Sequence, residues 1–148
     1  MIQSGADLTK FNEGLTLEAR PDRGKFELGY GCDYWGGAPT FAGQTCTEAE
    51  ADAQFALDYP LACSRAELDM GAIEYALLSE QRQAVLNDMA YEIGGAGLAQ
   101  FHDMLTALKA CRWNDAAQDL KDSKLFQQVP NREARNIQIL TTGEWPND

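Results

Sequence analysis

The feature that most constrains the fold is a change of pattern near residue 46. Residues 15 to 45 form short alternating runs broken by glycine and proline, which is typical of small β-hairpins: Pro21, Gly24, Gly36, Gly37, Pro39 and Gly43. Nearly all of the apolar residues after that point recur at helical spacing. A chain of this kind has room for only one small sheet, and the rest must be helical.

Helix signals frame the hairpin segment on both sides. Leu8 and Phe11 predict a short amphipathic helix that ends at Gly14, with Glu13 at its exit. The sequence Thr47-Glu-Ala-Glu50 offers a capping box for a long helix, which we expect to bend near Pro60.

Further helices are predicted along the C-terminal half. A buried helix carries Val85, Leu86, Met89, Ala90 and Ile93, and Gly94-Gly95 closes it. Another is marked by Leu98, Phe101, Leu105 and Leu108, and two short ones are expected near 114–122 and 131–140. The expected fold class is therefore α+β, mainly α. We expect a single domain over 1–148, with a small hairpin lobe of about 1–60, a connecting helix and a helical lobe of about 61–148, and a cleft between them as the binding site.

Composition excludes several classes of function. The net charge of −11 argues against nucleic-acid binding, which needs a basic surface. No apolar run approaches the roughly 20 residues of a membrane span, and the N-terminus lacks a signal-peptide layout, so we expect a soluble chain without stable membrane insertion. The four cysteines are 14, 17 and 48 residues apart, which fits no CxxC motif, and we expect no metal and no cofactor. Two disulfides and four thiols both remain open.

Carboxylates at a helix exit and on a neighbouring hairpin are what glycoside hydrolysis requires, because one group protonates the leaving oxygen while another activates water or attacks carbon. Glu13, Asp22 and Glu27 are the candidates. Strand alternation in 25–31 places Glu27 on the same face as Gly29 and Gly31, which leaves room for a sugar.

The segment EGLTLEARPDRGKFELGYG (13–31) resembles the phage lysozymes of glycoside hydrolase family 24, in which Glu-Gly-Leu is followed by an Asp nine residues after the Glu and by a Gly-x-Gly strand. The segments 87–97 and 101–145 resemble the same family, including R-W-N-D-A-A and P-N-R-x-x-R. The resemblance implies a lysozyme-like fold and an N-acetylmuramidase that acts as a monomer on bacterial peptidoglycan. A phage endolysin of this type would move from the host cytoplasm to the periplasm, and a chain that had lost a leader would be secreted.

The resemblance also implies roles for individual residues. Glu13 would be the general acid, Asp22 would hold or activate the attacking water, and Arg132 would be the cation near Glu13. Because an arginine favours the ionised carboxylate, apolar burial would have to oppose it. The saccharide cleft would be lined by Asp33, Tyr91, Met104 and Asp119.

Two positions depart from the family pattern. Glu27 stands where the family has Thr, and Cys32 stands where it commonly has His. A Glu27 about 5 Å from Glu13 could act as the nucleophile of a retaining enzyme, whereas a separation of about 6.5 to 9.5 Å leaves space for an inverting water. We expect Cys32 to pair with Cys46 or to pack as a small apolar residue, and not to act as a nucleophile.

Other readings stay open at this point. Glu27 could disable the water site and leave a glycan-binding or scaffold module, or the enzyme could prefer a chitin-like oligosaccharide that an acidic protein repels less. Tyr34 and Trp35 could stack on a sugar ring or pack beneath their loop.

Overall fold

The computed structural model describes residues 1–147, which form two compact units. The hairpin unit comprises Thr9–Leu61, and the helical unit comprises Met1–Leu8 together with the chain from Ala62 onward. Helices α1 (Gly5–Glu13) and α2 (Glu48–Met70) each contribute to both units. The predicted division into lobes of about 1–60 and 61–148 stays a prediction. No helix among residues 1–147 combines the length and the apolar content that crossing a membrane requires.

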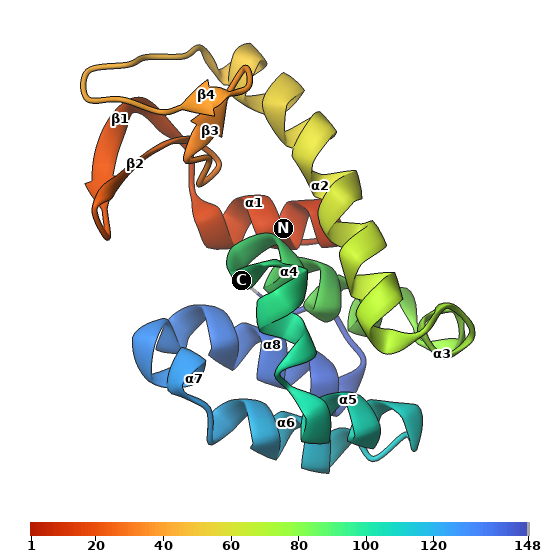
Figure 1. Cartoon of the computed structure of the whole chain (residues 1–148). Coiled ribbons are helices and arrows are strands. Elements are labelled where there is room, and N and C mark those ends of the chain that lie inside the picture. The colour runs from red at the N-terminus through yellow and green to blue at the C-terminus, as the bar shows by residue number, and fades with distance from the viewer. Residues whose placement is uncertain (148) are drawn as a thin grey trace. The chain divides into compact units, whose positions relative to one another are not determined.

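Two antiparallel hairpins make up the β-structure, shown in orange in Figure 1. The first pairs β1 (Thr16–Asp22) with β2 (Lys25–Gly29), and the second pairs β3 (Tyr34–Trp35) with β4 (Ala38–Pro39). The expectation of a single sheet was therefore wrong. The four-residue segment between β2 and β3 makes only an isolated bridge, between Leu28 and Cys32, which is too little to join the two ladders.

The capping signal at Thr47 was correct, because its hydroxyl accepts a hydrogen bond from the Glu50 N–H at 3.1 Å. The helix that follows, α2, continues through Pro60 to Met70. Its buried residues are mostly small and lie four or seven apart: Ala51, Phe55, Ala62, Ala66 and Met70. The larger leucines of this helix, Leu57, Leu61 and Leu68, are instead exposed. Helical spacing was enough to predict the helix, but which of its faces is buried depends on the residues that pack against it.

The helical unit contains six helices in the described part of the chain, besides the end of α2. They are α3 (Ala72–Leu77), α4 (Glu80–Ala99), α5 (His102–Lys109), α6 (Trp113–Lys121), α7 (Lys124–Gln128) and α8 (Pro130–Thr142). Figure 1 shows α5 to α8 as a group of short neighbouring helices, in which α6 packs on both α5 and α8. The sequence analysis did not foresee α3 and α7, which are only six and five residues long.

Gly94 interrupts α4 as predicted, with φ 74° and ψ 169°, but the helix resumes afterwards and runs to Ala99. Leu98 therefore belongs to this continuation, and α5 begins only after Phe101. The core of the helical unit gathers fully buried side chains from α4, α5, α6 and α8, among them Leu86, Met89, Leu108, Leu120 and Ile139.

All four cysteines lie in the described part of the chain, and none forms a disulfide. Cys32 and Cys46 are both buried as thiols, and the Cys32 Sγ lies 3.5 Å from the Asp58 Oδ2. Of the two expectations for Cys32, packing as a small residue is the one that the structure supports.

Candidate active site

Glu13 lies at the C-terminal end of α1, where local sequence turns the chain toward the hairpin. Gly14 adopts a left-handed conformation with φ 70°, and its N–H donates to the Lys10 carbonyl at 2.9 Å, which caps the helix. The backbone of Gly31 comes up to the Glu13 carboxylate so closely that a Cβ there would overlap Glu13 Oε2. Gly31 also has φ 75°, so both its conformation and its surroundings require glycine.

The first hairpin presents its charged residues on one face. Arg23 and Gly24 connect β1 to β2 with φ of 49° and 80°, the left-handed pair of a tight two-residue turn. In the register of this ladder Asp22 lies opposite Lys25, and Arg20 lies opposite Glu27. Because paired residues and those two positions along share a face, Asp22 and Glu27 are diagonal neighbours.

The carboxyl groups of Asp22 and Glu27 are close enough to influence each other's charge. Burial raises the pKa of Glu27 above its usual value, the negative charge of Asp22 raises it further, and Arg20 opposes both. The Arg20 Nη2 lies 3.6 Å from the Glu27 Oε2. Glu27 therefore keeps a proton to a higher pH than an exposed glutamate does, which suits a group that exchanges a proton beside a reacting centre.

Three further residues of the hairpin unit, Asp33, Tyr34 and Trp35, were considered as possible contacts for a sugar. Asp33 is ion-paired with Lys25 at 2.7 Å, and this contact raises the pKa of the lysine. A Cβ at Gly29 would meet the Trp35 ring at 3.0 Å, so this indole packs over the hairpin backbone. Of the two alternatives for Trp35, this contact favours packing over stacking on a sugar ring. Tyr34 is 57% exposed, so its ring is accessible to a ligand from solvent.

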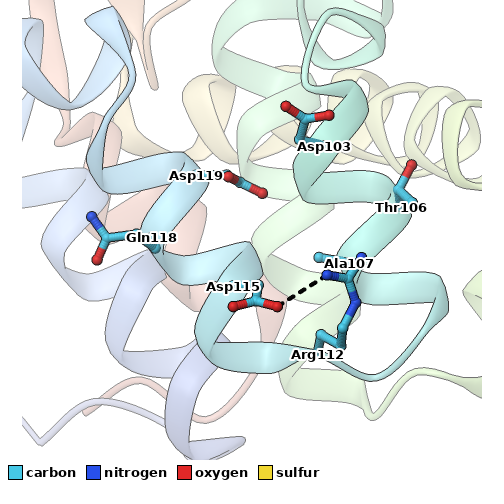
Figure 2. Close-up of a pocket in the computed structure, with 7 residues that line it drawn as sticks. All are labelled: Asp103, Thr106, Ala107, Arg112, Asp115, Gln118 and Asp119. Atoms are coloured by element: carbon cyan, nitrogen blue, oxygen red, sulfur yellow. Dashed lines mark hydrogen bonds and ion pairs between the residues drawn. The ribbon is translucent and has the colours of Figure 1, made fainter.

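In the helical unit the structure brings Met104 and Asp119 together. Both line a pocket of about 510 Å³ with Phe101, although the Met104 side chain is otherwise fully buried. A neighbouring pocket of about 330 Å³ lies between α5 and α6 and is drawn in Figure 2, where Asp103 and Asp119 flank one end and Arg112 pairs with Asp115 at the other. Tyr91 packs partly buried against the helical core.

Asp119 is the acidic centre of this region. Partial burial raises its pKa, and the nearby carboxylates of Asp103, Asp115 and Asp122 raise it further. Asp115, Asp119 and Asp122 are four and three residues apart, which is the spacing of one helix face. That spacing was a signal in the sequence that the analysis did not use.

Arg132 is the most heavily bonded of the predicted site residues. Its guanidinium forms a fork with Asp88, through Nε to Oδ2 at 3.0 Å and Nη2 to Oδ1 at 2.9 Å. Glu92 lies at ion-pair distance, 3.2 Å from the same Nε. Asp88 and Glu92 were not predicted from the sequence, although two acids four residues apart in the mostly apolar stretch 84–98 were a usable signal.

Among residues 1–147 no group of three histidine, cysteine or acidic side chains is arranged to hold a metal ion.

Comparison with known proteins places these features in one family. The sequence profile described as phage lysozyme matches residues 10–135. The probable T4-type lysozyme 2 of Dictyostelium discoideum is 24% identical over 164 residues, covering 97% of this chain and 96% of that protein. The probable T4-type lysozyme 1 of the same organism is 28% identical over 99 residues, covering 66% of this chain and 58% of the relative. The pre-baseplate central spike protein Gp5 of Enterobacteria phage T4 is 38% identical over 66 residues, 45% of this chain but only 12% of that protein.

Proposed function

Because the chain belongs to the phage lysozyme family, we propose that it is an N-acetylmuramidase, which cleaves the β-1,4 bond between N-acetylmuramic acid and N-acetylglucosamine in bacterial peptidoglycan. Family membership makes it a glycoside hydrolase of the lysozyme type and supports peptidoglycan hydrolysis in general. The bond that is cut and the residues that cut it are the proposal.

The observation that carries the proposal is the approach of Gly31 to the Glu13 carboxylate. Because Gly31 has no side chain, the Glu13 carboxylate can lie directly against the backbone at the end of the first hairpin, which fixes where the acid is held. Glu13 then acts as the general acid that protonates the glycosidic oxygen as the bond to the sugar C1 breaks.

Asp22 and Glu27 supply the second function that the reaction needs. A water molecule attacks C1 and gives its proton to one of the two carboxyl groups, with Asp22 as the proposed base and Glu27 beside it. Should Glu27 attack C1 directly, a covalent glycosyl-enzyme would form and the product would retain its anomeric configuration. The anomer of the first product distinguishes these two routes.

The predicted binding residues complete the proposal. Met104 and Asp119 lie in one pocket, where they could contact a saccharide together, while Asp33, Tyr91 and Arg132 would contribute from other positions. The enzyme would act as a monomer, either in the periplasm as a phage endolysin or outside the cell after secretion.

The test is the release of soluble fragments from purified peptidoglycan, with the new reducing ends identified by mass spectrometry. The wild-type chain should yield N-acetylmuramic acid ends, and Glu13→Gln should lower the rate on the order of 100-fold or more, as expected for a lost general acid. Glu144→Gln is the matched control, because this exposed residue loses the same charge outside the hairpin that carries Asp22 and Glu27.

Other outcomes have definite meanings. If neither the wild type nor Glu13→Gln releases fragments while both sediment with the peptidoglycan, the chain is a lysozyme-like glycan-binding module and the catalytic assignment is wrong. Faster turnover of chitooligosaccharide than of peptidoglycan would keep Glu13 as the acid and change the substrate.

A further inference from the structure

A buried polar cluster joins α4 to α8 within the helical unit. Its members are Asp88 and Glu92 from α4 and Arg132, Glu133 and Asn136 from α8. Asp88, Glu133 and Asn136 have no exposed surface, and Arg132 is 7% exposed. Taking this many charged groups out of water is costly unless they are paired and hydrogen-bonded, so their arrangement calls for an explanation.

Asp88 is the centre of the cluster. Both of its carboxylate oxygens accept from Arg132, and the Arg132 Nη2 also donates to the Asp88 backbone carbonyl at 3.3 Å. Asn136 Nδ2 donates to the Asp88 Oδ2 at 3.0 Å. A planar guanidinium bonded through Nε and Nη2 to one carboxylate has its plane fixed, and the direction of Nη1 is fixed with it.

Asn136 connects Glu133 to the Arg132–Asp88 pair. The Asn136 Nδ2 also lies 3.3 Å from the Glu133 Oε2, so one amide bridges two carboxyl groups. Glu133 Oε1 is buried and receives no hydrogen bond from an N–H or O–H donor of residues 1–147. A buried carboxyl oxygen without such a donor suits a carboxyl group that carries a proton.

We propose that Asp88 is a positioning residue for Arg132, with Asn136 holding Asp88 in turn, so that the guanidinium keeps one orientation. The inference rests on the proposed function, to which Arg132 contributes a cation. Asp88 acts through Arg132 and touches no reacting atom.

The charges agree with this role. Arg132 brings one positive charge, while Asp88, Glu92 and Glu133 could bring three negative ones. Burial and the charges of Glu92 and Asp88 raise the pKa of Glu133 to about 8, which favours its neutral form near neutral pH. A charge on Glu133 would compete with Asp88 for the guanidinium, and the neutral form avoids this.

The test begins with Asp88→Asn, which keeps the size of the side chain and removes the charge that holds the fork. We expect kcat on soluble peptidoglycan strands to fall on the order of tenfold to 100-fold, as a misplacement of about 1 Å can cause, with KM changed less than about twofold. The exposed residue Glu144 provides the control, because Glu144→Gln removes one charge from the same unit without touching the cluster.

A double-mutant cycle separates positioning from a general structural role. If Asp88 acts through Arg132, adding Asp88→Asn to Arg132→Gln should lower kcat by less than about twofold further, since the group to be positioned is already absent. Losses that multiply in the double variant would overturn the proposal, as would an unchanged kcat in Asp88→Asn alone.

A spectroscopic readout does not depend on activity. The Arg132 Nε–H should exchange slowly with water in ¹⁵N NMR spectra of the wild-type chain and at least tenfold faster in Asp88→Asn. An unchanged exchange rate would refute the role of Asp88. If Asp88→Asn does not fold, Asn136→Ser removes one donor to Asp88 and keeps every charge, and it should also speed the exchange. A wild-type chain without turnover would refute the proposed function, whereas the exchange rates would still decide whether Asp88 holds Arg132.

Discussion

The buried carboxyl group of Glu133 should make the stability of the chain fall as the pH rises. Its usual pKa is 4.5, and its value in the folded chain is about 8. Between these two values the unfolded side chain releases its proton while the folded one keeps it. The stabilising effect of the buried neutral carboxyl is therefore complete below about pH 4.5 and is lost progressively toward pH 8.

The size of the effect follows from the same two values. Each unit of pKa difference corresponds to about 1.4 kcal/mol, so the full span from 4.5 to about 8 amounts to on the order of 5 kcal/mol as an upper bound. Glu133→Gln abolishes the titration and keeps the size of the side chain. Its amide can still accept a hydrogen bond from Asn136 and can donate one toward Glu92.

The assay is urea unfolding followed by circular dichroism at pH 5 and at pH 8. With a slope of about 2 kcal/mol per molar urea, the midpoint of Glu133→Gln relative to wild type should rise by at least about 1 M between the two pH values. The same comparison with Glu144→Gln should show no such change, because that side chain is exposed. A midpoint difference for Glu133→Gln that stays constant from pH 5 to pH 8 would refute the reasoning.

Two further predictions concern the hairpin unit. Gly31→Ala should lower the rate of peptidoglycan hydrolysis at least tenfold more than Gly36→Ala does. Both glycines have positive φ, so each variant loses about 1–2 kcal/mol of stability to backbone strain, but only the new Cβ at position 31 meets Glu13. Equal losses in rate per folded molecule would show that this approach is unimportant. Asp22→Asn should lower kcat on the order of 100-fold, whereas Glu27→Gln, whose amide can still donate to Asp22, should keep at least about a tenth of the activity. The reverse order, with a retained anomer in the wild-type product, would make Glu27 the nucleophile.

Signals confined to a few neighbouring residues were sufficient to predict local structure. The exit of α1 at Glu13, the break of α4 at Gly94 and the cap at Thr47 each depend on backbone conformations or hydrogen bonds within about four residues. The alternation in 25–29 likewise placed Glu27 on its face of β2, because successive strand residues point to opposite sides. The phage lysozyme family could also be recognised, since its motifs run through both ends of the chain.

Properties that depend on residues far apart in the chain could not be read in this way. The face of α2 that is buried follows from what packs against it, and small residues such as Ala62 and Ala66 occupy it while Leu68 is exposed. Whether Cys32 is a free thiol or part of a disulfide depends on its neighbours within the hairpin unit, where the thiol donates a hydrogen bond to the Asp58 carboxylate.

The sequence by itself determined the hairpin segment before residue 46, the Glu13 exit, the cap at Thr47 and the family, because each of these is specified by short-range geometry or by contiguous motifs. Only the tertiary structure decided that burial and the charge of Asp22 raise the pKa of Glu27 and that Asp88 bonds to Arg132 across 44 residues of sequence. The physical reason is that the pKa and the orientation of a charged side chain are set by burial and by partners, and both arise only when distant segments pack together.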